Sequence, residues 1–148
     1  MENMNRSESN LIEKAIAVAP KAHAGRKDKA NEPYILHPLR VMLQMRTEEE
    51  RLAAVLHDVV EDSDTTIKDL QRAGFPAEVI EAVRLLTRLR EDTYDEFIEK
   101  LKPDPLARRV KIADLRDNLR LERIPHPTRE DEVRFEKCRN ALRLLEAS

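Results

Sequence analysis

The sequence AAVLHDVVEDSDT at residues 53–65 places polar side chains directly after a run of apolar ones. The side chains that can do chemistry here are His57, Asp58, Glu61 and Asp62. If one helix runs through the segment, Glu61 shares a face with His57, and the two aspartates share the neighbouring strip. Carboxylates this close to one another and to a core are costly, and a bound divalent cation would offset that cost. The simpler alternative is the solvated end of a helix.

A metal site needs more ligands than one imidazole and one carboxylate, so other parts of the chain must supply them. His37 is one candidate, since it stands between apolar residues and a proline in YILHPLRV. Asp114 is a second, since it adjoins an apolar helical stripe in RRVKIADLRDNLR. Each alone has a simpler interpretation, as a histidine at a helix start and as a solvated aspartate. The candidate ligands are therefore His37 and Asp114 together with the His57–Asp58 doublet and its acidic neighbours.

The elements that hold these residues are expected to be helices. Hydrophobic residues make up 41% and charged residues 38% of the chain, whereas aromatic residues make up 3% and there are only 2 glycines. This composition favours helices over a β-sandwich or barrel, which need frequent turns and many aromatic or β-branched residues. No segment shows convincing alternation with period two. We therefore expect an all-α protein, a compact single-core bundle of about seven to nine helices.

Apolar periodicity and capping residues predict where these helices lie. We expect helices over residues 10–24, 66–74, 76–89, 94–101 and 106–121. Three further helices are expected to start near Pro38, at Thr47 and at Thr128. Pro20 is expected to kink or split the first helix, and residues 1–8 are expected to fray. The helix after Thr47 is expected to bury a single stripe, formed by Leu52, Val55, Leu56 and Val59.

Charge balance and cysteine content limit the classes of function. The net charge is −2, so no general electrostatic grip on nucleic acid is expected. Cys138 has no second cysteine to pair with, which fits a reducing cytoplasm. The apolar run at residues 15–19 is far too short to span a membrane or to form a convincing signal peptide. We expect a cytoplasmic protein with a small-molecule partner, neither nucleic acid nor membrane, and an oligomeric state that the sequence does not give.

Together, His37, the His57–Asp58 pair and Asp114 resemble the pattern of the HD-domain metal phosphohydrolases: a histidine, a His-Asp doublet and a distant aspartate. The segments RKDKANEPYILHP, AAVLHDVVEDSDTT and VKIADLRDNLR are similar to the hydrolase domain of the RelA/SpoT alarmone family. By size, the chain most resembles the small alarmone hydrolases, which include the metazoan SpoT homolog. The resemblance covers residues 22–120, so we expect one HD-type hydrolase domain over residues 1–148.

The resemblance also implies a role for each residue of the site. One Mn²⁺ ion would be bound by His37, His57, Asp58 and Asp114. Mixed imidazole and carboxylate ligands suit Mn²⁺, although other divalent ions would also bind them. An acidic pair would work beside the metal-bound water: Glu61 and Asp62. The phosphates would contact a basic pair, Arg26 and Lys27, and the nucleoside would contact Asn118.

The implied reaction is hydrolysis of the 3′-pyrophosphate of an alarmone, (p)ppGpp, to GDP or GTP and pyrophosphate. Two departures leave the base open: Leu121 stands where many family members have threonine, and residues 89–109 look unlike the long bifunctional enzymes. Alternative substrates are therefore (p)ppApp and the 2′-phosphate of NADPH. A domain that senses a nucleotide without hydrolysing it is an alternative of another class, but Glu61 and Asp62 add more to activating water than to binding an anion.

Two further residues near these motifs have two interpretations each. His23 is expected to pack in the core or to support the site, and not to bind the ion. Lys111 lies three residues before Asp114, so it either reaches the cavity or pairs with an acid on the surface.

Overall fold

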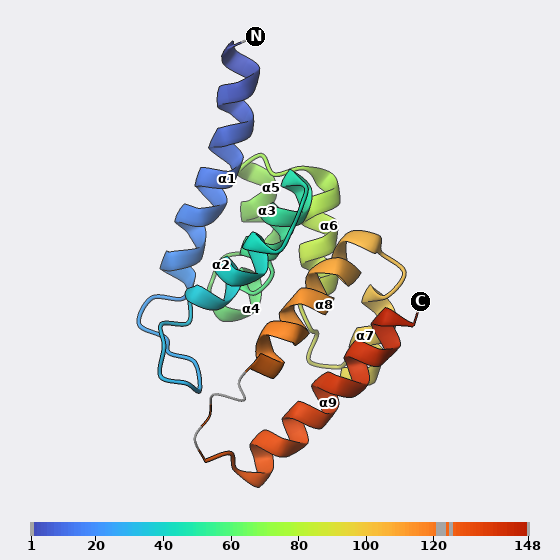
Figure 1. The fold of residues 1–148 in the computed structure, drawn as a ribbon. Coiled ribbons are helices and arrows are strands. Elements are labelled where there is room, and N and C mark those ends of the chain that lie inside the picture. Colours follow the sequence, from blue (N-terminus) through green and yellow to red (C-terminus); the bar gives the residue numbers. More distant parts are fainter. Residues whose placement is uncertain (1, 121–123, 125, 148) are drawn as a thin grey trace.

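The computed structural model describes residues 2–120, 124 and 126–147, which contain helices, one isolated bridge between Lys27 and Pro33, and no strand. The helices are α1 (Glu2–Ala22), α2 (Leu36–Leu43), α3 (Glu48–Leu56), α4 (Val59–Asp62), α5 (Ile67–Arg72), α6 (Ala77–Leu86), α7 (Tyr94–Leu101), α8 (Pro105–Leu119) and α9 (Arg129–Glu146) (Figure 1). Over this part of the chain, the prediction of an all-α protein with seven to nine helices is confirmed. Leu121 lies outside the described residues.

Helix α3 lies at the centre of the fold. It packs against α1, α2, α6 and α8, and residues 52–56 are all fully buried. The sequence predicts one buried stripe on this helix, but Ala53 and Ala54 are covered as well. The last five residues of α3 are apolar on every side and buried, so this half of the helix carries the residues that follow it into the interior.

The chain leaves helical geometry at the His57–Asp58 doublet. Helix α3 ends at Leu56 and α4 begins at Val59, and Asp58 has φ −104° and ψ −3°. This is the sparsely populated bridge region, which turn and active-site residues often adopt. The prediction that the helix after Thr47 includes Val59 is therefore wrong, and a separate short helix positions Glu61 and Asp62.

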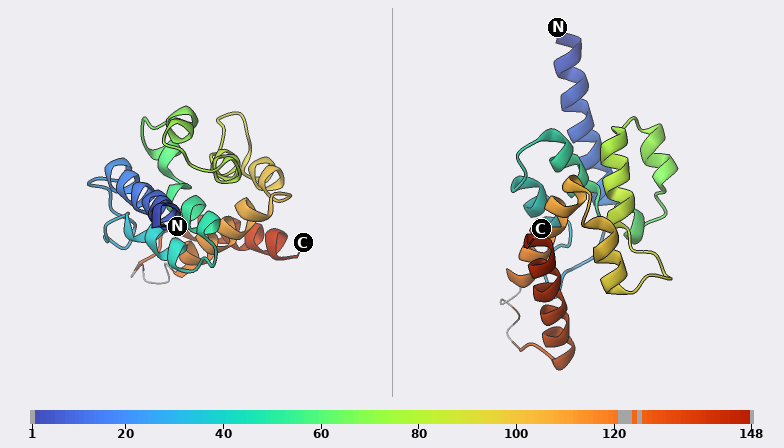
Figure 2. Two further views of the ribbon diagram at one scale, coloured as in Figure 1. Left: turned by 90° about the horizontal axis from the view of Figure 1, so that it is seen from above. Right: turned by 90° about the vertical axis from the view of Figure 1, so that its right-hand side faces the viewer.

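Two other predicted helix limits also differ from the structure. Helix α1 begins at Glu2, so its backbone is helical through residues expected to fray, and its first turns project beyond the other helices (Figure 2). Pro20 lies in the last turn of α1 and does not split it. Helix α6 ends at Leu86, because Thr87 has an extended backbone, and Leu89 is exposed beyond the helix.

Helix α8 brings the C-terminal part of the chain to the same region. It is capped by the Asp104 carboxylate, which accepts hydrogen bonds from the N–H groups of Leu106 and Ala107. Helix α8 packs on α2, α3, α6 and α9, so it lies against the helix that carries His37 and the helix that ends just before the doublet. Among the described residues, no helix is both long enough and apolar enough to cross a membrane.

Replacing Leu52 by alanine is expected to destabilise the protein strongly. Leu52 is fully buried at the centre of α3, and deleting a buried leucine side chain leaves a cavity that costs about 2–5 kcal/mol. The matched control is Leu43→Ala, because Leu43 is 77% exposed and its loss leaves no cavity. Urea unfolding measures both, and equal midpoints for the two variants would contradict the packing described here.

Asp131→Asn is expected to lower the Tm near neutral pH and to matter less in acid. Hydrogen bonds from Lys29 and from the backbone N–H of Thr128 lower the pKa of Asp131 to about 2, against 3.8 for an ordinary aspartate. A carboxyl whose pKa is lower in the folded than in the unfolded protein stabilises the folded state at pH values above its unfolded-state pKa. That stabilisation is lost as the pH falls toward its folded-state pKa. The Tm difference from wild type should therefore narrow below about pH 4. Asp95→Asn, at an exposed first-turn position of α7, is the control.

Candidate metal centre

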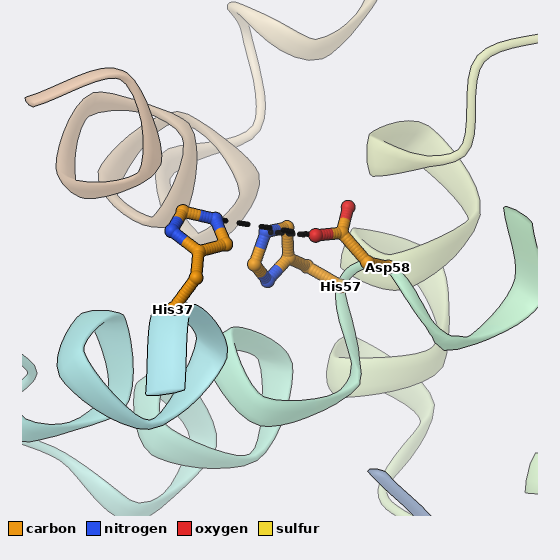
Figure 3. Close-up of side chains that lie close together, drawn as sticks. All are labelled: His37, His57 and Asp58. Atoms are coloured by element: carbon orange, nitrogen blue, oxygen red, sulfur yellow. Dashed lines mark ion pairs between the residues drawn. The ribbon is translucent and has the colours of Figure 1, made fainter. Parts of the chain in front are cut away.

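Three parts of the fold bring the predicted ligands together. His37 is buried in the first turn of α2, the His57–Asp58 doublet joins α3 to α4, and Asp114 is buried on α8. Figure 3 shows the His37 and His57 rings and the Asp58 carboxylate turned toward one another. One ligand atom from each of these three residues lies within 4.8 Å of the other two.

The orientation of His57 is fixed by the backbone of its own helix. Its Nδ1 lies 2.5 Å from the carbonyl oxygen of Ala54, so Nδ1 carries the proton and donates it. The other ring nitrogen, Nε2, is buried without a hydrogen-bond partner among the described residues. Nε2 is 3.1 Å from Asp58 Oδ2 and 3.4 Å from Asp114 Oδ1. A buried imidazole nitrogen that faces two carboxylates has the arrangement of a metal ligand.

Asp114 completes the group from the side of α8. Its Oδ1 lies 2.7 Å from His37 Nε2, and its Oδ2 accepts a hydrogen bond of 2.7 Å from Lys111. The side chain of Lys111 is 14% exposed and lies over the Phe97 ring at 5.3 Å. Of the two interpretations of Lys111, the structure therefore shows the one in which it reaches the site. Asn118, one turn further along α8, places its Nδ2 3.4 Å from Asp114 Oδ1.

The carboxylates around His37 and His57 favour a positive charge between them, either on the imidazoles or on a bound metal ion. Burial lowers the pKa of His37, but its hydrogen bonds with Asp114 and Asp117 outweigh burial and raise the pKa to about 9. Burial likewise opposes protonation of His57, yet Asp58 and Asp114 raise its pKa well above the usual value. A metal ion would supply the same positive charge and would release protons on binding. We therefore expect metal affinity to increase with pH.

The donor set fits a divalent metal ion. It combines two imidazoles with two carboxylates, all buried or half-buried, and such mixed nitrogen and oxygen ligands suit Mn²⁺, Fe²⁺ or Zn²⁺. The unpartnered Nε2 of His57 is the observation that tests the fit, because a buried polar atom without a partner is costly unless a ligand satisfies it.

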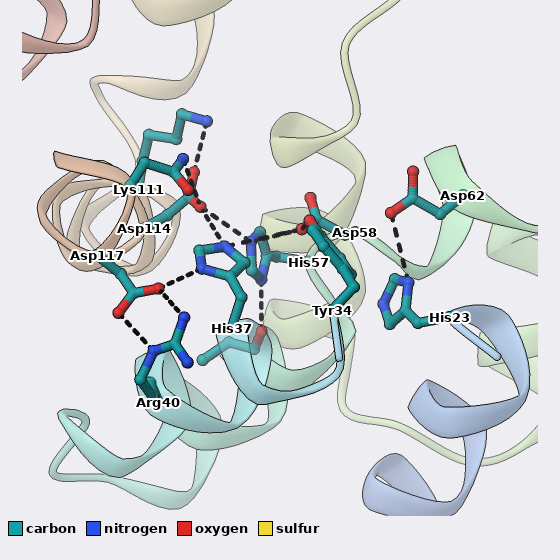
Figure 4. A network of polar contacts seen from close by, with 12 residues as sticks. His23, Tyr34, His37, Arg40, His57, Asp58, Asp62, Lys111, Asp114 and Asp117 are labelled. Carbon is teal, nitrogen blue, oxygen red and sulfur yellow. Dashed lines mark hydrogen bonds and ion pairs between the residues drawn. The ribbon is translucent and has the colours of Figure 1, made fainter. Parts of the chain in front are cut away.

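Three residues that the sequence analysis did not assign support the ligands (Figure 4). The Tyr34 hydroxyl donates a hydrogen bond of 2.5 Å to Asp58 Oδ2. Asp117 Oδ2 lies 2.6 Å from His37 Nδ1, and Arg40 donates to both oxygens of Asp117. Helical spacing is the signal that could have found two of them, because Arg40 follows His37, and Asp117 follows Asp114, by three residues.

The predicted acidic pair of α4 lies next to the ligands, with its carboxylates turned to different neighbours. Glu61 accepts a hydrogen bond of 2.5 Å from the backbone N–H of Arg88. Asp62 lies 2.5 Å from the Arg26 guanidinium and 3.4 Å from Nδ1 of His23. His23 is buried, so the structure agrees with its predicted packing or supporting position.

The predicted basic pair lies in the loop between α1 and α2. The Arg26 guanidinium lies 4.5 Å from the centre of the Tyr34 ring, so it is adjacent to the Asp58 side of the site. Lys27 is exposed in the same loop. The structure thus brings Arg26 to the acidic residues, while Lys27 faces solvent.

Comparison with known proteins identifies relatives of this chain. A match to the family described as HD domain covers residues 15–124. The chain is 32% identical over 120 residues to the guanosine-3′,5′-bis(diphosphate) 3′-pyrophosphohydrolase of Aquifex aeolicus (strain VF5), covering 74% of this chain and 17% of that protein. It is also 32% identical over 123 residues to the bifunctional (p)ppGpp synthase/hydrolase SpoT of Escherichia coli (strain K12), covering 74% and 18%. The chain therefore spans less than a fifth of the length of these relatives.

A solved structure gives a match of similar length. It is that of a metazoan ortholog of SpoT that hydrolyzes ppGpp, with a TM-score of 0.73 and 27% sequence identity, covering 90% of this chain and 85% of that one. The family match and these similarities agree with the geometry of the site. The chain belongs to the HD domain family and is homologous to the SpoT-type ppGpp 3′-pyrophosphohydrolases.

Proposed function

We propose that this chain is a metal-dependent phosphohydrolase that removes the 3′-pyrophosphate of (p)ppGpp, giving GDP or GTP and pyrophosphate. The observation that carries the proposal is the convergence of His37, Asp58 and Asp114 on the buried, unpartnered Nε2 of His57. The choice of substrate is supported by the relatives named as ppGpp 3′-pyrophosphohydrolases and by the metazoan SpoT ortholog.

Mn²⁺ is the ion that we propose for the site, with four ligands: His37, His57, Asp58 and Asp114. When bound, the ion would polarise a phosphoryl oxygen and lower the pKa of a coordinated water. The surrounding chain orients the ligands for this task. The Ala54 carbonyl fixes the His57 ring, and the Tyr34 hydroxyl fixes the Asp58 carboxylate.

We propose that Glu61 accepts the proton of the attacking water and that Asp62 orients the reacting groups. Loss of hydration raises the pKa of the Glu61 carboxyl, and the Arg88 N–H only partly opposes this rise. A general base works best when its pKa is close to the operating pH. Asp62 is held by the Arg26 guanidinium, so its carboxylate is already paired, and Glu61 is the better proton acceptor.

The remaining predicted residues suit the proposed contacts with substrate. Arg26 contacts Asp62 through Nη1, so the Nε–Nη2 edge of its guanidinium can make a bidentate contact with a pyrophosphate while Asp62 stays paired. Lys27 extends from the same loop as a solvent-exposed cation. Asn118 lies beside the ligand Asp114, and we propose that its amide contacts the nucleoside.

A panel of nucleotides tests this proposal. The Mn²⁺-loaded protein is incubated with ppGpp, ppApp and NADPH, and the products are separated by anion-exchange chromatography. We expect pyrophosphate and GDP from ppGpp. Faster pyrophosphate release from ppApp than from ppGpp would show that the substrate carries adenine and not guanine. Phosphate release from NADPH, without turnover of either alarmone, would show that the chain is a 2′-phosphatase. Binding of ppGpp by the loaded protein without any turnover would favour the nucleotide sensor.

A further inference from the structure

His37 lies between two carboxylates of the same helix. Its Nε2 lies 2.7 Å from Asp114 Oδ1 and its Nδ1 lies 2.6 Å from Asp117 Oδ2. The two aspartates are one turn apart on α8, so they face the same side. Arg40 is one turn after His37 on α2 and donates to Asp117 Oδ1 from Nε at 2.8 Å and to Oδ2 from Nη2 at 3.0 Å. Figure 4 shows this arrangement across the α2–α8 contact.

The two histidines of the site are therefore held by different groups. His57 donates from Nδ1 to a neutral backbone carbonyl of its own helix. His37 meets a carboxylate carried by another helix, 80 residues away in sequence. The side chain of Asp117 is only 1% exposed, and a buried carboxylate is costly unless it is paired. The bidentate contact with Arg40 provides that pairing, since the guanidinium fork matches both carboxylate oxygens.

We propose that Asp117 and Arg40 are positioning residues that fix the ring of His37 for metal binding. The Nδ1–H group of His37 donates a hydrogen bond to Asp117, which leaves Nε2 as the ring nitrogen that can bind the metal ion. Arg40 holds the Asp117 carboxylate in the orientation that this contact needs. A carboxylate behind a metal-binding histidine fixes its ring and increases its basicity, and loss of such a partner typically costs about 10–100-fold in metal affinity. The inference rests on the metal site of the proposed function.

The test measures metal binding without substrate. Mn²⁺ affinity is determined by isothermal titration calorimetry for the wild-type chain and for Asp117→Asn, which keeps the shape of the side chain and removes its charge. We expect the Kd for Mn²⁺ to rise about 10–100-fold in this variant. Arg40→Met should also raise the Kd for Mn²⁺. Arg40→Lys should raise it less, because lysine still places a positive charge beside Asp117.

The double variant Arg40→Met/Asp117→Asn separates an indirect role of Arg40 from a direct one. If Arg40 acts through Asp117, the double variant should lose no more affinity than Asp117→Asn alone. The control is Arg116→Met, which removes an arginine of α8 that pairs with Glu146 on the surface at 2.9 Å. Its Mn²⁺ affinity should equal that of the wild type. Thermal unfolding of each variant without metal shows whether any loss of affinity reflects a loss of folding.

Three results would overturn the inference. One is an unchanged Kd in folded Asp117→Asn, and another is a loss in Arg40→Met that Arg40→Lys does not reduce. The third is a wild-type chain that binds no Mn²⁺, which removes the metal site as well. If only the proposed function is wrong, the result is different. The wild type and the variants then bind Mn²⁺ with the expected order of Kd values, but the wild type does not hydrolyse ppGpp. If Asp117→Asn fails to fold, the Kd values of Arg40→Met and Arg40→Lys for Mn²⁺ test the inference in its place.

Discussion

Replacing His57 by alanine is expected to abolish both Mn²⁺ binding and ppGpp hydrolysis. The substitution removes the Nε2 atom that lies 3.1 Å from Asp58 and 3.4 Å from Asp114, so both carboxylates lose the imidazole nitrogen that faces them. A metal ion contributes several kcal/mol to stabilising a phosphoryl-transfer transition state, and about 4 kcal/mol corresponds to a 10³-fold change in rate. We therefore expect kcat/KM to fall by at least about 10³-fold, measured by pyrophosphate release under subsaturating ppGpp.

Two further variants make this result specific to metal binding. Asp58→Asn keeps the size of a half-buried side chain and should also lose most activity, without the cavity that His57→Ala creates in the core. His126→Ala removes an exposed histidine and should leave activity unchanged. Hydrolysis by folded His57→Ala within about tenfold of the wild-type rate, or about 1.4 kcal/mol, would exclude His57 from the ligand set.

Glu61→Gln is expected to give the second largest effect, with metal binding retained. The variant keeps the hydrogen-bonding shape of the side chain but cannot accept a proton, and general base catalysis typically contributes about 10²–10⁴-fold to the rate. We expect kcat to fall by this factor while the Kd for Mn²⁺ stays close to that of the wild type. Asp62→Asn should lose less, because Asp62 is paired with Arg26 and acts in our account by orientation.

The pH dependence distinguishes these two acids. If Glu61 is the general base, the acidic limb of the kcat profile reports its pKa and should disappear in Glu61→Gln. Asp64→Asn, at an exposed position just after α4, is the matched control and should keep both rate and profile. A larger loss in Asp62→Asn than in Glu61→Gln would reverse the two roles.

The proposed ligand set came from three short motifs that together resemble the HD-domain pattern, each motif beside an apolar stripe. His37, His57, Asp58 and Asp114 meet in the structure as expected. The conformation of the doublet was not predictable from periodicity, because residues 52–59 have a continuous helical pattern. No glycine or proline stands at the break, and these are the local signals that end helices.

The supporting residues were harder to predict for a similar reason. Asp117 and Arg40 each have the sequence context of a solvated charge, and their contact depends on how α2 packs on α8. Tyr34 lies in a loop, where its contact with Asp58 depends on tertiary structure alone. The assignment of one hydrolase domain to residues 1–148 and the cytoplasmic location stay predictions.

Metal dependence of hydrolysis is measured as pyrophosphate release from ppGpp by metal-stripped protein as Mn²⁺ is added back. We expect no release after treatment with a chelator. As Mn²⁺ is added back, one pyrophosphate should be released for each GDP that forms, and the rate should rise until one equivalent of Mn²⁺ is bound. Equal release before and after addition of Mn²⁺ would contradict the proposed function. So would the absence of any release from ppGpp by a folded protein that holds one Mn²⁺ ion.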